Sequence, residues 1–171
     1  IACSVTPSFP LPFLYMFRFG MRAELNKSLA NIQYYGRGPI ENYVDRNNCT
    51  FIGKYSQTVD EQFYPYIRPQ ENSSHYKTRF AQVGEENGNS LVFTPHGMKD
   101  FVFNASHYSA EQLTEVKHDF ELQNEHKTIV NLDWRFNAIS ENAELNNSEN
   151  KRLLDDKVFS FGFVITPQQA E

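Results

Sequence analysis

Alternation of large apolar residues with other residues predicts that most of the chain forms short β-strands. Between Thr128 and Phe136, every second residue is a large apolar one, as in a strand with one buried face. Between Val158 and Thr166, phenylalanines alternate with small or apolar residues, so both faces of this central strand are expected to be buried. The expected strands cover residues 14–25, 31–35, 51–59, 78–83, 90–94, 101–104, 128–136 and 158–166.

Two of these strands predict which side chains share a face. In the strand at residues 14–25, one face carries Phe17, Phe19, Met21 and Ala23, and the other carries Arg18 and Arg22. Trp134 shares a face with Val130 and Leu132, so core packing is favoured over sugar stacking for its ring.

The segments between the strands contain one predicted helix. Ser109 is followed three residues later by Gln112, which fits a capping box, so a short helix is expected from Ala110 to Val116. Residues 1–13 are punctuated by prolines and predict an irregular or extended lead-in. Residues 60–75 form a long section without clear periodicity, which favours a functional or interface role.

Composition agrees with a β-rich domain that has a substantial core. The chain has 171 residues, of which 15% are aromatic, and its many short strands with one helix predict an all-β protein, a large antiparallel β-sandwich. The net charge is −5 and the basic residues are scattered, which excludes a nucleic-acid-binding face. No apolar run is long enough to span a bilayer, so no membrane partner is expected.

A dense polar and aromatic stretch follows the strand at residues 31–35. The strand is expected to break at Gly36 and again at Gly38-Pro39, because glycine permits unusual backbone angles and proline removes a hydrogen-bond donor. So many hydrogen-bonding groups over so few residues predict a loop held by its own side chains. These groups are Tyr35, Arg37, Glu41, Tyr43, Asp45 and Arg46.

The two carboxylates of this stretch are weak candidates for catalysis. A retaining glycosidase needs two carboxylates about 5–5.5 Å apart. Arg37 and Arg46 lie beside Glu41 and Asp45 in the sequence, and arginine neighbours lower a carboxylate pKa, which disfavours a general acid at neutral pH. Ion pairs that lock the loop are therefore expected, with Glu41 and Arg46 as the main pair.

Other chemistry receives little support from the sequence. The five histidines lack metal-binding spacing, and no metal site is predicted. An epimerase would need a histidine and a glutamate as acid and base, and His107 or His118 with Glu71 are the conceivable pairs. Cys3 and Cys49 leave one disulfide open as an alternative. Tyr64 and Tyr66 flank Pro65, where exposure, an interdomain contact and burial remain open.

Several motifs occur in an order that resembles a known family. Gly38-Pro39-x-Glu41-x-Tyr43-x-Asp45-Arg46 is similar to a signature of the C-terminal domain, or small chain, of family 2 glycoside hydrolases that are β-galactosidases. Tyr64-Pro65-Tyr66-x-x-Pro69-Gln70-Glu71-Asn72 is similar to the next, second motif of that family. Thr78-Arg79, a run from Phe101 to Ser109, Leu113, His118 and Asn131-Leu132-Asp133 follow in the same order. The resemblance covers roughly residues 18–136.

The resemblance implies a fold and a role for the chain. The family domain is a sandwich of the galactose-mutarotase type with additional upstream strands, so residues 14–171 are expected to be an N-terminally truncated portion of it. The catalytic glutamates of the family lie in a separate barrel domain, so no catalytic residue and no cofactor is expected here, and any Mg or Na of the parent enzyme would lie in other domains. The chain would cover the barrel active site and stabilise the assembly of an enzyme that hydrolyses terminal β-D-galactosides.

The resemblance also sets the expected partners. These are the catalytic barrel domain, weakly bound β-galactoside or galactose, and a second copy of the fragment through the sheet edge that truncation exposes. A free-standing carbohydrate-binding module is the alternative function, and an aldose-1-epimerase-like enzyme comes third. The compartment stays open between the bacterial cytoplasm and periplasm.

One departure from the family concerns the polar loop at residues 138–156. In the family, the loop that follows the strand matching Asn131-Leu132-Asp133 often carries a tryptophan that stacks on the substrate. Counting forward places Leu145 at that position, between Asn142, Glu144 and further polar residues. We expect this substrate-adjacent loop to bind galactose weakly or to favour a different aglycone, unless the loop has been remodelled.

Overall fold

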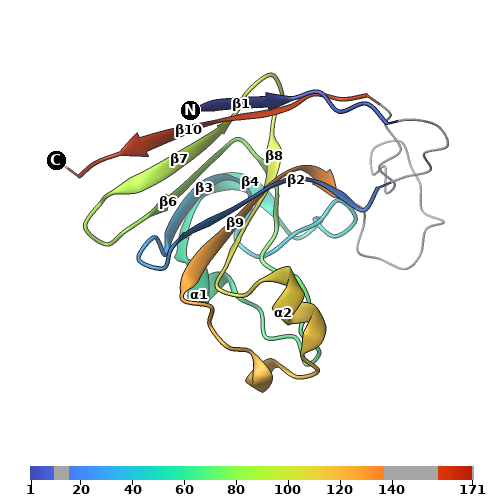
Figure 1. Ribbon diagram of the computed structural model, residues 1–171, viewed down its shortest axis with the longest axis vertical. Coiled ribbons are helices and arrows are strands. Elements are labelled where there is room, and N and C mark those ends of the chain that lie inside the picture. The colour runs from blue at the N-terminus through green and yellow to red at the C-terminus, as the bar shows by residue number, and fades with distance from the viewer. Residues whose placement is uncertain (10–15, 137–157, 171) are drawn as a thin grey trace.

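The computed structural model describes residues 1–9, 16–136 and 158–170. Two antiparallel sheets pack face to face (Figure 1). The six-stranded sheet has the order β1-β10-β7-β6-β3-β4, and the four-stranded sheet has the order β2-β9-β8-β5. The strands are β1 (Ala2–Val5), β2 (Arg18–Asn26), β3 (Asn31–Gly38), β4 (Phe51–Thr58), β5 (His75–Thr78), β6 (Phe80–Gly84), β7 (Ser90–Pro95), β8 (Phe101–Ser106), β9 (Lys127–Phe136) and β10 (Phe161–Gln168). The all-β sandwich expected from the sequence is therefore confirmed.

The core lies between the two sheets and is dominated by aromatic rings. Phe93 of β7 and Phe103 of β8 are fully buried, and the Tyr34 ring of β3 lies 6.3 Å from the Phe103 ring across the interface. Phe19 of β2 meets Phe161 of β10 edge-on at 6.0 Å. These contacts join one sheet to the other, so burial of the rings removes the inner face of each sheet from water.

The C-terminal strand β10 lies inside the six-stranded sheet, between β1 and β7. Phe161, Gly162 and Phe163 are all buried, which confirms the central position predicted from the two apolar faces. A Cβ on Gly162 would lie 2.5 Å from the carbonyl oxygen of His96, so only glycine allows this approach. The strand begins at Phe161, three residues later than predicted.

Three expectations at strand ends are corrected. The lead-in is not wholly irregular: Ala2–Val5 form β1, whose side chains are exposed and which is held by its pairing with β10. Phe17 is 74% exposed, because it precedes β2 and so falls outside its alternation. β3 continues through Gly36 to Gly38, since a Cβ at Gly36 would lie 2.6–2.9 Å from Thr78 and glycine serves close packing there rather than a turn.

The described helical segments are short and number more than the one predicted. Helix α2 (Ala110–Glu115) starts at Ser109, whose hydroxyl accepts from the amide of Gln112 at 3.2 Å, as expected. Gln112 does not complete a capping box; its side chain instead binds the main chain of Gln123. Helix α1 (Val59–Gln62) has a complete capping box between Thr58 and Glu61, and a 3-10 turn, η1, spans Asp119–Glu121.

Candidate functional site

The signature loop, residues 39–50, joins β3 to β4 and is built around the carboxylate of Glu41. The main-chain amide of Ser73 donates to this carboxylate at 2.9 Å, and the Tyr43 hydroxyl donates at 3.1 Å. Arg46 and the Tyr66 hydroxyl both contact its other oxygen. Glu41 is only 10% exposed although Arg46 is 45% exposed, so the carboxylate is the buried centre of the loop and the arginine covers it from outside.

The rest of the loop is pinned by its own side chains, as the sequence predicted. The amide of Asn42 is fully buried, donates to the carbonyl oxygens of Arg37 and Ile40, and accepts from the main-chain amide of Tyr76 at 2.8 Å. The main-chain amides of Tyr43 and Arg46 each donate to the carbonyl oxygen of the other residue. This pairing places Asp45 in the turn between them.

β3 ends at Gly38 as expected, whereas Arg37 acts differently from expectation. Gly38, before the cis peptide bond to Pro39, lies against two phenol rings, where a Cβ would be 2.4 Å from the Tyr34 hydroxyl. Arg37 donates to the carbonyl oxygens of Asn47 and Thr50, at 3.1 and 2.7 Å, rather than to a carboxylate. The expectation that Arg37 neutralises Glu41 or Asp45 is therefore wrong, since its side chain closes the loop through main-chain contacts.

The structure brings the second motif against the first. Tyr66 contacts Glu41 and accepts from Arg46 at 3.0 Å, and burial followed by the hydrogen bond to Glu41 raises the pKa of the Tyr66 phenol. Pro69 is buried, and Asn72 accepts from the main-chain amide of Tyr64 at 3.2 Å. The two motifs lie about 25 residues apart in the sequence yet form one hydrogen-bonded unit.

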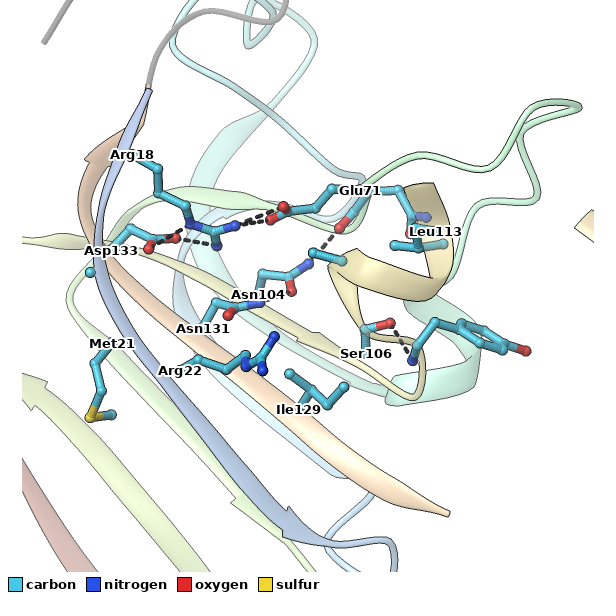
Figure 2. Close-up of a pocket in the computed structure, with 14 residues that line it drawn as sticks. Arg18, Met21, Arg22, Glu71, Asn104, Ser106, Leu113, Ile129, Asn131 and Asp133 are labelled. Atoms are coloured by element: carbon cyan, nitrogen blue, oxygen red, sulfur yellow. Dashed lines mark hydrogen bonds and ion pairs between the residues drawn. The ribbon is translucent and has the colours of Figure 1, made fainter. Parts of the chain in front are cut away.

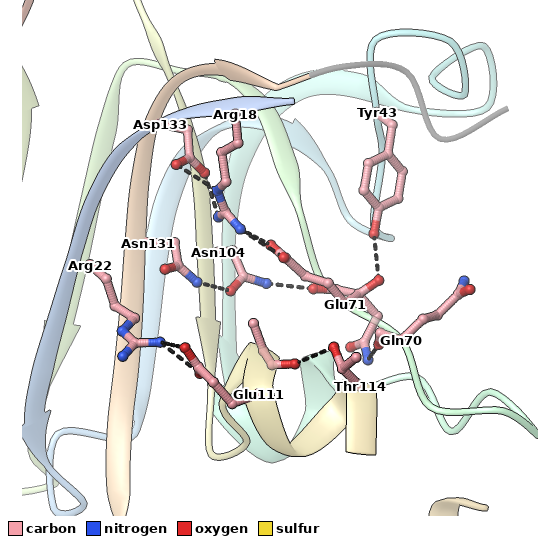
Figure 3. Close-up of polar contacts among 12 residues, drawn as sticks. Arg18, Arg22, Tyr43, Gln70, Glu71, Asn104, Glu111, Thr114, Asn131 and Asp133 are labelled. Atoms are coloured by element: carbon pink, nitrogen blue, oxygen red, sulfur yellow. Dashed lines mark hydrogen bonds and ion pairs between the residues drawn. The ribbon is translucent and has the colours of Figure 1, made fainter. Parts of the chain in front are cut away.

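Glu71 extends this unit to the four-stranded sheet through Arg18 (Figure 3). Arg18 of β2 donates to both oxygens of Glu71, at 2.8 and 2.7 Å, and to both oxygens of Asp133 of β9, at 2.8 and 2.6 Å. Asp133 is 3% exposed, whereas Glu71 is 34% exposed. The guanidinium therefore lies between two carboxylates, one buried and one in partial contact with water.

Burial and neighbouring charges shift the pKa values of Arg18 and Asp133. Burial alone would lower the pKa of Arg18, but the hydrogen bonds and charges of Asp133 and Glu71 raise it above its ordinary value. Burial raises the pKa of Asp133 to about 6, and Arg18 offsets part of that rise. The guanidinium of Arg18 thus compensates the charge of the buried Asp133 carboxylate.

A row of amides, the buried Asn104 and the half-buried Asn131, continues from the triad across the sheet. Asn131 of β9 donates to the side-chain oxygen of Asn104 at 2.9 Å, and Asn104 donates to the carbonyl oxygen of Asn72. Arg18, Asp133, Asn104 and Asn131 were not predicted as site residues. Their signal in the sequence is a polar side chain with apolar residues on both sides of it in a predicted strand or directly after one, which is typical of a polar network beside the core.

These residues line a cavity of about 310 Å³ on the outer face of the four-stranded sheet, with helix α2 at one side (Figure 2). Arg18 and Glu71 lie at one end of the cavity, and Ser106 and Ile129 lie toward the other. The remaining lining residues are Gly20, Met21, Arg22, Asn72, Asn104, Tyr108, Ala110, Leu113, Asn131 and Asp133.

The predicted aromatic residues divide between core and surface. Trp134 stacks on Phe159, with ring centroids 3.8 Å apart and planes 7° apart, so the expected core role is confirmed. Tyr64 is 56% exposed, and its ring lies 4.6 Å from that of Tyr66. Tyr64 is thus the aromatic ring of the second motif that faces solvent.

The histidines and cysteines do not form the pairs considered from the sequence. His107 is buried, binds the carbonyl oxygen of Lys127 at 2.8 Å and faces Asp60, while His118 stacks on Phe120; neither is in contact with Glu71. Cys3 and Cys49 are exposed and free, so they form no disulfide. Within the described ranges, no cluster of potential metal ligands occurs and no helix could cross a membrane. Asn142, Glu144 and Leu145 lie outside the described residues.

His75 gives the site a predictable response to acid. It is completely buried, stacks on Tyr34 and lies 3.2 Å from the carbonyl oxygen of Arg37, and burial lowers its pKa to about 3. The unfolded chain protonates this residue near pH 6.5 and the folded chain does not, so stability should fall as the pH decreases from about 6.5 toward 3. The slope from one such proton is at most about 1.4 kcal/mol per pH unit.

We expect His75→Gln to flatten this dependence in urea unfolding measured between neutral and acidic pH. His118→Gln is the matched control, because His118 lies on the surface in η1's N-terminal cap. An unchanged slope in His75→Gln would contradict the assignment.

Known proteins resemble this chain in sequence. The family described as "Beta galactosidase small chain" matches residues 1–165. The β-galactosidase of Actinobacillus pleuropneumoniae is 32% identical over 154 residues, which are 90% of this chain and 15% of that protein. The β-galactosidase of Streptococcus thermophilus is 35% identical over 74% of this chain and 12% of its own length. The β-galactosidase of Vibrio cholerae serotype O1 is 40% identical over 77% of this chain and 11% of its own length.

The match extends over the whole site. It includes β2 with Arg18, the signature loop, the second motif and β9 with Asp133. The chain spans only 11–15% of the three relatives, so it corresponds to a small part of each. On the extent of the family match, the chain belongs to the β-galactosidase small-chain family.

Proposed function

We propose that the chain is a non-catalytic C-terminal domain of a β-galactosidase of glycoside hydrolase family 2. In this proposal the sandwich is of the galactose-mutarotase type, covers one side of a catalytic barrel and stabilises the assembly. The parent enzyme would hydrolyse terminal β-D-galactosides with two glutamates of the barrel. Family membership and the small share of each relative that the chain spans support this reading.

The observation that best supports the proposal is that the carboxylates of the site are already bound by side chains of the chain itself. Retaining glycosidases place two carboxylates about 5–5.5 Å apart with the sugar between them. Glu71 and Asp133 do approach each other, but the guanidinium of Arg18 occupies the space between them and binds both. Glu41 accepts from four groups at once. These carboxylates are structural, because Arg18, Arg46 and two phenols hold them, and none is free to act as a nucleophile or a general acid.

An epimerase role has no geometric support among the described residues. The reaction needs a base and an acid that face one sugar. The imidazole of His107 is buried against Lys127 and Asp60, and His118 lies by Glu121 at the surface. Neither histidine lines the cavity that Glu71 borders. The separate barrel domain thus remains the better source of the catalytic groups.

The proposal predicts that the purified chain alone hydrolyses no β-galactoside. A chromogenic galactoside would be incubated with the chain, with the Actinobacillus pleuropneumoniae β-galactosidase as the positive control. We expect the rate to equal that of buffer, because Arg18 binds both Glu71 and Asp133, and Arg46 and two phenols bind Glu41. Turnover that persists through re-purification and disappears in Glu71→Gln would contradict the proposal.

A further inference from the structure

The cavity on the outer face of the four-stranded sheet retains hydrogen-bonding capacity that the fold does not use. The amide nitrogen of Asn131 donates to Asn104, while its side-chain oxygen accepts from none of the described residues. The oxygen of Ser106 accepts from the main-chain amide of Tyr108 at 3.0 Å, and its hydroxyl proton has no acceptor in the described part of the chain. The cavity therefore presents at least one acceptor and one donor to a ligand (Figure 2).

Glu71 adds further acceptors at one end of the same cavity. Each of its carboxylate oxygens accepts one hydrogen bond from Arg18. A carboxylate oxygen has two lone-pair directions, and the side chain is 34% exposed, so each oxygen can accept a second bond. These acceptors point to a ligand that carries several hydroxyl groups.

The charges that line the cavity cancel, which selects against charged ligands. Arg18 is bound by Asp133 and Glu71, and Arg22 donates to Glu111 at 2.9 and 3.0 Å. An anion would approach two carboxylates and a cation would approach two guanidinium groups, and either would disturb ion pairs that are already complete. A neutral ligand avoids both costs.

Size and wall chemistry narrow the ligand class. A volume of about 310 Å³ is at the lower end of the range for small-molecule sites. Leu113 of α2 and Ile129 of β9 form an apolar part of the wall. A ring that has hydroxyl groups at its edge and C–H groups on its face matches this combination of polar and apolar lining.

We propose that this cavity binds one neutral, monosaccharide-sized polyhydroxy compound, such as a pyranose sugar. Asn131 and Glu71 accept from its hydroxyl groups, Ser106 donates to one, and Leu113 contacts the C–H face. The proposal does not depend on the function proposed above, because the site lies wholly within this chain.

The test is a titration of the 15N-labelled chain with D-galactose, D-glucose and myo-inositol, followed by NMR shifts of the Asn131 side-chain amide and the Ser106 main-chain amide. D-galacturonate and D-glucosamine serve as anionic and cationic analogues. We expect saturable shifts at both positions with millimolar affinity for at least one neutral compound, and affinities about tenfold weaker for the charged analogues. No saturable shift with any neutral compound, or tighter binding of a charged analogue, would overturn the proposal.

Two variants locate the site. Asn131→Ala and Ser106→Ala should each weaken neutral-ligand binding at least about threefold, while Asn48→Ala, at an exposed position of the signature loop, should leave it unchanged. The amide spectrum of each variant reports directly on folding. If Asn131→Ala does not fold, the affinity of Ser106→Ala still tests the site. Undiminished affinity in the folded variants would place the ligand elsewhere and contradict the assignment.

Discussion

Replacing Arg18 with methionine should destabilise the chain by roughly 3–5 kcal/mol, as expected when one partner of a buried ion pair is removed. Asp133 would lose the guanidinium that compensates its charge while only 3% of its side chain is exposed, so it would either remain as a buried charge or have to take up a proton. Methionine retains most of the side-chain volume, so loss of packing contributes little. Urea unfolding at neutral pH, followed by tryptophan fluorescence of Trp134, measures the change.

The matched control is Arg22→Met on the same strand. Arg22 is 42% exposed and pairs with Glu111, which is 65% exposed, so this change should cost less than about 1 kcal/mol. The double variant Arg18→Met with Asp133→Leu removes both members of the buried pair and should recover much of the loss. Equal effects of Arg18→Met and Arg22→Met would show that burial of Asp133 does not govern the energetics.

Acid should partly rescue Arg18→Met. The pKa of Asp133 is already raised to about 6 by burial, and removal of Arg18 raises it further. The folded variant then binds a proton that the unfolded chain, with an aspartate pKa near 3.9, releases. The stability deficit relative to the wild type should therefore shrink as the pH falls toward 4.

The parts of the fold that were predictable are those in which side-chain burial follows the backbone period. β9 and β10 carry apolar residues at alternate positions, and both lie in the interior of their sheets. β1 was missed because its four residues are all exposed and its stability comes from main-chain pairing, which leaves no apolar pattern. Helix α1 was missed although Thr58 and Glu61 form a capping box, since one turn is too short to show helical periodicity.

The candidate site was predictable only where its contacts are local. The pairing of Glu41 with Arg46 spans five residues and could be expected from the density of polar groups in the short loop between β3 and β4. Contacts of Arg18 with Glu71 and Asp133 span 53 and 115 residues and depend on the pairing of β2 with β9. Sheet order is set by the whole core, so no local pattern in the sequence could place these three side chains together.

The second large effect concerns Glu41→Ala, which should cost on the order of 3 kcal/mol. The change removes one acceptor from four donors. Two of the donors, the Ser73 amide and the Tyr43 hydroxyl, belong to residues that are only 2% and 3% exposed, and an unsatisfied buried donor costs about 1–3 kcal/mol. Thermal and urea unfolding would both show the loss, and Glu86→Ala on an exposed turn serves as the control.

Arg46→Ala distinguishes the two ways in which Glu41 could stabilise the loop. If the ion pair dominates, Arg46→Ala should cost nearly as much as Glu41→Ala. Arg46 is 45% exposed, however, and a half-exposed pair contributes less than about 1 kcal/mol. We therefore expect Arg46→Ala to be mild, because Ser73, Tyr43 and Tyr66 still satisfy the carboxylate. Comparable losses in the two variants would instead make the arginine the main partner, as the sequence alone suggested.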